Sequence, residues 1–195
     1  VENSQIIGSV LWDAYRGHDI EISYFGPKTM TLGIARGCAR LAMDYFHVSR
    51  VTARTSRSNK MMTRGIKKIG FEYEGICHNG YGDEDAIMYG LYGHKLARLA
   101  GIDSLHTGTV VGKMEGGEEE VTKINQFLLS EWYGLKRVLP VASGGLYPNL
   151  IPDLMKILGN DVLLNFGGGI HGHPQGSKAG AMAVCQAVEA VGLGK

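Results

Sequence analysis

The chain has 195 residues, of which 44% are hydrophobic and 29 are glycine, and its formal net charge is +1. This length supports a core without disulfide or metal staples, and three widely spaced cysteines with no CxxC pair argue against a disulfide framework and a cysteine-based zinc site. Because no apolar run reaches the roughly 18 residues of a membrane span and no signal pattern opens the sequence, we expect a soluble, cytoplasmic protein with no membrane partner.

Residues 5–92 predict a hairpin, a helix, a strand, a second helix and a second hairpin. Apolar and polar residues alternate at 20–25 as in a half-buried strand, and the apolar spacing from Met30 to His47 is typical of a helix. Ser58 and Asn59 precede a basic segment as an N-cap precedes a helix, and Gly70 ends it. The expected strands span residues 5–14, 20–25, 50–55, 71–76 and 85–92, and the expected helices span residues 30–47 and 60–69.

Positive charge is concentrated in the first half of the chain. The segment from Lys28 to Lys68 contains ten basic residues and one acid, Asp44, which gives it a local charge of +9. Such a segment attracts phosphate groups, although a solvated helix face explains it equally well. Aromatic residues do not alternate with these basic residues as they do in nucleic-acid stacking platforms, so nucleic acid is not an expected partner.

Residues 96–192 repeat a strand, a loop and a helix three times. Continuous apolar strands alternating with amphipathic helices indicate parallel βα units, and three units are too few to close a (β/α)8 barrel. We expect the strands to be adjacent in chain order with right-handed crossovers, and their exposed edges to be covered by the first half or by self-association. The expected strands span residues 104–111, 138–142 and 162–166, and the expected helices span residues 118–130, 148–158 and 176–191.

The two patterns divide the chain into expected domains at residues 1–93 and 94–195. A helix at 95–100 leads into the second domain, and no Pro/Ser-rich linker separates the halves. The fold class is therefore α/β, with a mixed α+β first half and three parallel βα units in the second half.

Glycines follow each expected strand of the second half. The loops contain Lys113 between glycines, then Ser143-Gly144-Gly145, then Gly167-Gly168-Gly169. Glycines after parallel strands let backbone N–H groups approach an anion, so two such loops side by side predict a phosphate pocket, with plain tight turns as the alternative. The nearby pair His171 and His173 is interpreted as loop structure rather than as a metal site.

Three segments of the second half resemble the last three βα units of the Rubisco large subunit, closest to the form III type. They read LHTGTVVGKMEG at 105–116, PVASGG at 140–145 and NFGGGIHGHP at 165–174. The resemblance implies that Lys113 is the catalytic loop lysine that closes over the substrate. It also implies that His106 and Ser143 contact a sugar bisphosphate, and that four glycines donate backbone N–H groups to phosphate: Gly144, Gly145, Gly168 and Gly169.

The departures from the Rubisco pattern concern the metal. The family binds Mg²⁺ through a carbamylated lysine followed closely by two acids, and no KxDDE run is found in this sequence. The substrate-binding His-Arg segment and the N-terminal domain of the family are also missing. The resemblance therefore implies binding of a phosphorylated sugar without carboxylation by this chain alone.

The first half resembles the second half of a small, phage-type GNAT acetyltransferase. The segments RTSRSN at 54–59 and IGFE at 69–72 carry this resemblance. It implies acetyl-CoA against the strand ending at Phe25, with Gly33 and Ala35 at its pyrophosphate and Asn59 at its pantetheine arm. Met30 replaces an expected Gln or Arg, and Ile66 stands where the family has a catalytic tyrosine. Without this context Asn59 is only an N-cap, and this interpretation has the same weight as contact with the cofactor.

Together the two resemblances indicate a chimera-like chain. Binding of a sugar bisphosphate is the first expected function, a GNAT-type acyltransferase using acetyl-CoA is the second, and a non-catalytic interaction protein is the third.

Overall fold

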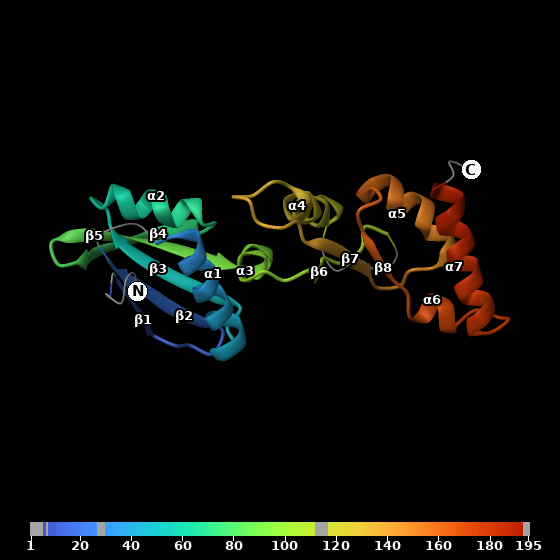
Figure 1. Ribbon diagram of the computed structural model, residues 1–195, viewed down its shortest axis with the longest axis horizontal. Coiled ribbons are helices and arrows are strands. Elements are labelled where there is room, and N and C mark those ends of the chain that lie inside the picture. The colour runs from blue at the N-terminus through green and yellow to red at the C-terminus, as the bar shows by residue number, and fades with distance from the viewer. Residues whose placement is uncertain (1–5, 7, 27–29, 112–116, 193–195) are drawn as a thin grey trace. The chain divides into compact units, whose positions relative to one another are not determined.

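The computed structural model describes residues 6, 8–26, 30–111 and 117–192. The chain forms two compact units, Val1–Ile102 and Asp103–Lys195, here called unit 1 and unit 2. In Figure 1 unit 1 runs from blue to green and unit 2 from yellow-green to red. None of the helices among the described residues combines the length and hydropathy that crossing a bilayer requires.

Unit 1 is built on a five-stranded mixed sheet. Its strands lie in the order β1-β2-β3-β5-β4, with β2 and β3 parallel and the other neighbours antiparallel. All five strands were expected from the sequence, although their ends differ by several residues. They are β1 (Ser9–Asp13), β2 (Asp19–Phe25), β3 (Arg50–Ser56), β4 (Glu72–Tyr81) and β5 (Glu84–Tyr92).

The expected helix at 30–47 is an α-helix followed by a π-helical turn. Helix α1 (Leu32–Arg40) is capped by Thr31, whose hydroxyl accepts the Ile34 N–H, and η1 (Leu41–Tyr45) continues it with wider turns. This segment ends at Phe46, whose ring lies 5.3 Å from that of Trp12. Helix α2 (Lys60–Lys68) begins where expected, because the Asn59 side chain accepts the Met62 N–H at 3.0 Å.

Helix α3 (Gly93–Ala100) packs within unit 1, where it contacts α1, β3 and β5. Leu96 and Leu99 are each 1% exposed, and Arg40 donates from Nε to the Ala100 carbonyl at 2.7 Å. The helix expected at 95–100 is therefore present, but it covers the first sheet instead of leading into the second. Burial of its apolar face is the physical reason that the units divide after Ile102 and not at residue 93.

Unit 2 contains the three parallel strands expected from the sequence, adjacent in chain order. They are β6 (Ser104–His106), β7 (Leu139–Ser143) and β8 (Leu163–Asn165), in the order β6-β7-β8. Strand β6 ends earlier than the expected 104–111: Gly108 has a φ of 89°, which an extended strand does not allow, and the Thr109 hydroxyl then bonds the Val111 carbonyl at 2.8 Å in a local turn. The handedness of the crossovers and the covering of the sheet edges stay predictions.

The helices of unit 2 follow the strands as expected, with one addition. They are α4 (Glu118–Leu129), α5 (Ile151–Leu158) after the 3-10 turn η2 (Pro148–Leu150), the short α6 (Gly168–His171) and α7 (Ser177–Gly192). Ala142 of β7 and Leu154 of α5 form the buried core, with Leu164 of β8 packed against it. Leu139 and Leu163, the first residues of β7 and β8, are 37% and 41% exposed.

Candidate functional site

The residues assigned to acetyl-CoA lie around a cavity in unit 1. Strands β2 and β3 pair only from Asp19 to Glu21 along β2, and the cavity is lined by the residues that follow, including Ile22 and Ala53. Ala35 is 3% exposed and lines the cavity, as does Asn59. Gly33 is exposed at the start of α1, so the three predicted residues lie on two helices at one side of the sheet.

The N-cap interpretation of Asn59 is confirmed by its hydrogen bond to Met62. Asn59 also lines the cavity, and its role toward a cofactor stays a prediction. Ile66, at the position of the family's tyrosine, is 7% exposed and lines the cavity with a hydrocarbon side chain. The described wall therefore contains no proton donor at that position.

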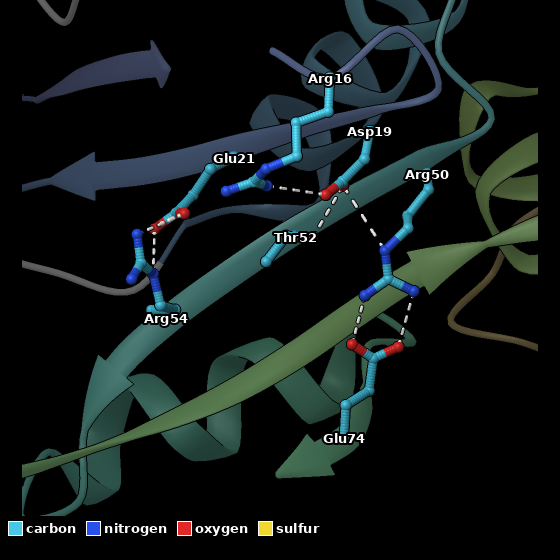
Figure 2. A network of polar contacts seen from close by, with 7 residues as sticks. All are labelled: Arg16, Asp19, Glu21, Arg50, Thr52, Arg54 and Glu74. Carbon is cyan, nitrogen blue, oxygen red and sulfur yellow. Dashed lines mark hydrogen bonds and ion pairs between the residues drawn. The ribbon is translucent and has the colours of Figure 1, made fainter. Parts of the chain in front are cut away.

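A polar network, which sequence reasoning missed, crosses the strands of unit 1 (Figure 2). Arg54 makes two hydrogen bonds of 2.7 Å to the carboxylate of Glu21, which is 6% exposed. Thr52 donates to Asp19 at 2.8 Å, and Arg50 lies between Asp19 and Glu74 with a 2.7 Å bond from Nη1 to Glu74. The period-2 alternation of β2 and β3 could have placed these residues on one face, but their partners depend on the register.

This network accounts for part of the basic segment. The hydrogen bond to Glu74 raises the pKa of Arg50, and the hydrogen bond to Glu21 raises the pKa of Arg54. Arg57 adds an ion pair with Asp85 at 3.6 Å. The arginines of β3 and of the loop after it are therefore engaged with acids of the same unit, which favours a structural role for them over phosphate binding.

In unit 2 the predicted phosphate-binding residues lie at the carboxyl ends of parallel strands. Ser143 is the last residue of β7 and is directly opposite Asn165, the last residue of β8. His106 ends β6, is exposed, and lies opposite Val141. Equivalent loops therefore leave β7 and β8 on the same edge of the sheet, as expected from the sequence.

The loops after β7 and β8 touch through their backbones. Gly169 is buried, and a Cβ atom at this position would lie 1.9 Å from the Leu146 carbonyl oxygen, so only glycine permits this approach. Gly144 and Gly145 both have positive φ, at 113° and 61°. The sequence predicted these glycines as phosphate donors, and the structure adds that Gly169 joins the two loops.

Gly168 differs from Gly169 because it lies in open space. It is exposed at the start of α6, where the first backbone N–H groups of a helix have no intrahelical acceptor, and nothing lies within 4 Å of a Cβ placed there. Lys113, the predicted catalytic lysine, lies outside the described residues.

The two histidines after β8 make local contacts. His171 Nδ1 lies 3.0 Å from the Ser177 hydroxyl, and His173 Nδ1 accepts the Gln175 N–H at 3.1 Å. These contacts join α6 to the start of α7, as expected for loop structure.

Comparison with known proteins decides the family. Residues 87–195, more than half of the chain, match the sequence model of the ribulose bisphosphate carboxylase large chain, catalytic domain. The chain belongs to this family. It is 54% identical over 96 residues to ribulose bisphosphate carboxylase of Pyrococcus furiosus. The aligned region covers 49% of this chain and 23% of the relative.

Solved structures give the same family for the matched region. Octameric Rubisco from Pyrococcus horikoshii OT3 is similar with a TM-score of 0.50 and 50% identity, over 52% of this chain and 24% of that chain. A probable acetyltransferase is similar with a TM-score of 0.42 and 19% identity, over 46% of this chain and 56% of that chain. That second likeness is too weak to decide the family of unit 1. The chain spans about a quarter of the length of its Rubisco relatives.

The Rubisco match does not stop at the boundary between the units. It begins at Ile87 within β5 and continues through α3, and both elements pack in unit 1. Leu91, Leu96 and Leu99 of this overlap line the cavity of unit 1. Residues of the Rubisco match therefore complete the core of the first unit.

The magnesium ion of the Rubisco family does not fit the described residues. No group of three or more histidine, cysteine, aspartate or glutamate side chains in the described ranges could hold a metal ion. Mg²⁺ prefers octahedral oxygen ligands from carboxylates and phosphates, and the sequence contains no KxDDE run. No step that uses magnesium is therefore assigned to this chain.

Proposed function

We propose that unit 2 binds a phosphorylated sugar through the loops after β7 and β8. The observation that carries the proposal is the contact of Gly169 with Leu146, which brings two glycine loops together at the carboxyl edge of a parallel sheet. Ligands of parallel α/β sheets bind at this edge, where backbone N–H groups reach an anion. Membership in the Rubisco family supports a sugar bisphosphate as the ligand.

Each predicted residue has a role in this proposal. Ser143 and the N–H groups of Gly144, Gly145, Gly168 and Gly169 hold one phosphate, and His106 contacts the ligand from β6. The resemblance to Rubisco assigns the role of catalytic lysine to Lys113, which lies outside the described residues. The chain binds without carboxylating alone, because the described residues do not supply the acids that would hold magnesium.

Calorimetric titration of the full chain with ribulose bisphosphate and with inorganic phosphate tests this proposal. We expect weak binding of the bisphosphate, which Gly168→Asp abolishes by adding negative charge where the side chain has room. Gly168→Ala, which adds only a methyl group in the same open space, is the matched control and keeps binding. Equal binding by the Asp and Ala variants would place the anion elsewhere and contradict the proposal.

A second candidate, a GNAT-type acyltransferase that uses acetyl-CoA, is favoured by one feature of unit 1. Strands β2 and β3 pair over three residues, Asp19 to Glu21 with Arg50 to Thr52, and a cavity opens beyond them, where the resemblance puts the coenzyme. We expect acetyl-CoA to bind and Gly33→Leu to abolish binding, since bulk at the start of α1 blocks backbone approach to the pyrophosphate. Gly37→Leu, in open space on the same helix, is the control. Binding that survives Gly33→Leu would contradict this candidate.

A further inference from the structure

Unit 1 contains a cavity between its sheet and its helices, lined mostly by apolar side chains and also by polar ones, among them Ser23, Arg54 and Thr55. The cavity has a volume of about 150 Å³. Its deepest walls are the core side chains of α1, β3, β5 and α3, namely Ala39, Val51, Leu91, Leu96 and Leu99, each 1–3% exposed. These side chains present only hydrocarbon to the cavity.

Two features of unit 1 leave this space unfilled. Helix α1 turns small side chains toward the sheet, because Ala35, Cys38 and Ala39 all line the cavity. Strands β2 and β3 also cease to pair after Glu21 and Thr52, so no ladder draws the following residues together. Protein interiors are normally packed to crystal density, so a space of this size is a specific feature of the fold.

The cavity opens toward solvent near the start of α2. Phe25 and Tyr81 line it and are 58% and 51% exposed, and Asn59 beside them is also exposed. The Asn59 side chain bonds the Met62 N–H, and the Tyr81 hydroxyl donates to the Arg54 carbonyl at 3.4 Å. A molecule that enters here therefore meets polar groups engaged with the protein at the mouth, and hydrocarbon beyond it.

We propose that this cavity binds a hydrocarbon group of about six carbons. A closed apolar cavity of about 150 Å³ takes up benzene, so the volume of this cavity suits a hydrocarbon group of that size. The Cys38 thiol fits this environment, since burial raises its pKa and keeps it neutral. The hydrocarbon group is either a free small molecule or the acyl chain of a coenzyme A thioester.

The inference goes beyond the acyltransferase candidate, because it requires no coenzyme and assigns the deep part of the cavity. Benzene is the first probe, and Trp12, which lines the cavity, reports on unit 1 in a full-length Trp132→Phe chain. Benzene at ten times its dissociation constant raises the melting temperature of unit 1 by about 6–11 °C, because it binds only the folded state.

Two leucine substitutions on α1 locate the benzene. Ala39→Leu fills the deep end and removes the rise in melting temperature, whereas Gly37→Leu, on the open side of the helix, keeps it. No rise in the parent chain, or an equal rise in the Ala39→Leu chain, overturns the inference.

A labelling experiment needs no change in the cavity wall. In a chain carrying Cys77→Ser and Cys185→Ser, Cys38 is the remaining thiol. Benzene at ten times its dissociation constant slows the reaction of Cys38 with methyl methanethiosulfonate about tenfold by occupying the space beside it. An unchanged rate overturns the inference even if Ala39→Leu fails to fold.

Coenzyme A and hexanoyl-CoA separate this inference from the acyltransferase candidate. Tighter binding of hexanoyl-CoA than of coenzyme A, lost in Ala39→Leu, supports an acyl chain as the occupant. Benzene binding without coenzyme A binding supports the cavity and contradicts the acyltransferase. Coenzyme A binding without benzene binding overturns the cavity inference and leaves the acyltransferase candidate standing.

Discussion

The sheets of unit 1 and unit 2 are held by different means. The strands of unit 1 are five to ten residues long and carry ion pairs from strand to strand on one face, such as Arg54 with Glu21. Two of the three strands of unit 2 have only three residues, and its loops meet through the backbone at Gly169. Unit 1 is therefore specified mainly by side chains, whereas the candidate site of unit 2 is specified mainly by backbone geometry.

The boundary of the Rubisco match in the sequence and the boundary between the two packed units do not coincide. Residues 87–102 match the Rubisco family by sequence and belong to unit 1 by packing. The side chains of this overlap, and not their family, decide which sheet they cover. The two tryptophans allow each unit to be followed separately, because Trp12 lies in unit 1 and Trp132 in unit 2.

The largest effect is expected from Leu96→Asp, which tests the membership of α3 in unit 1. A charge at a site 1% exposed has no partner there and costs about 3–5 kcal/mol, enough to unfold a marginal unit. Trp12 fluorescence in a Trp132→Phe chain should report the loss of stability of unit 1. Trp132 fluorescence in a Trp12→Phe chain should report an unchanged stability of unit 2. Leu11→Asp on β1, at a residue 49% exposed, is the control. An unchanged Trp12 transition in the Leu96→Asp chain would remove α3 from the core of unit 1.

Gly169→Ala tests the backbone contact in unit 2. The added Cβ would overlap the Leu146 carbonyl oxygen, so the loops must separate at a cost of about 1–3 kcal/mol. Urea unfolding followed by Trp132 measures this cost. Gly168→Ala, which meets nothing, should leave the midpoint unchanged or raise it slightly. Equal midpoints for the two variants would mean that the loops do not touch.

These expectations also define what the sequence could predict. Alternating apolar residues at 20–25 and continuous apolar runs in the second half predicted strands in both sheets, and the N-cap at Asn59 was visible because Asn precedes a helical segment. The contact of Gly169 with Leu146 could not be predicted, since a glycine run is equally consistent with a plain turn. The partners of Arg50 and Arg54 depend on strand register, and the cavity depends on how β2 and β3 diverge, neither of which a periodic pattern contains.

Arg54→Met tests the side-chain network of unit 1. It leaves the buried Glu21 carboxylate without its bidentate partner, and we expect a loss of about 1–2 kcal/mol, since Arg54 is itself partly exposed. A double-mutant cycle with Glu21→Gln, followed by Trp12, isolates the pair. Arg16→Met, which breaks an exposed pair with Asp19, should cost less than about 0.5 kcal/mol. A coupling energy near zero would show that the network on this face is incidental.

The smallest effect is expected at Glu72, and it depends on pH. Hydrogen bonds from Lys95 and Tyr92 lower the pKa of Glu72, so its ionised form stabilises the fold above its ordinary pKa of 4.5. This contribution is lost as pH falls below about 4.5 and through the lowered value. Glu72→Gln should therefore lower the melting temperature of unit 1 at pH 7, with the difference from the parent narrowing toward pH 3. A difference that is constant over this range would assign the effect to packing.

The strand order of unit 1 has a consequence for synthesis on the ribosome. β5 lies between β3 and β4, so β3 has an open edge until residues 84–92 have been made. The 44 residues from Arg57 to Ala100 take roughly 2–9 s at ordinary elongation rates, and only then can α3 close the apolar face. During that interval the nascent chain exposes an unpaired strand edge, the form in which chains associate wrongly. Slower translation through this stretch would extend the period in which the edge of β3 is unpaired.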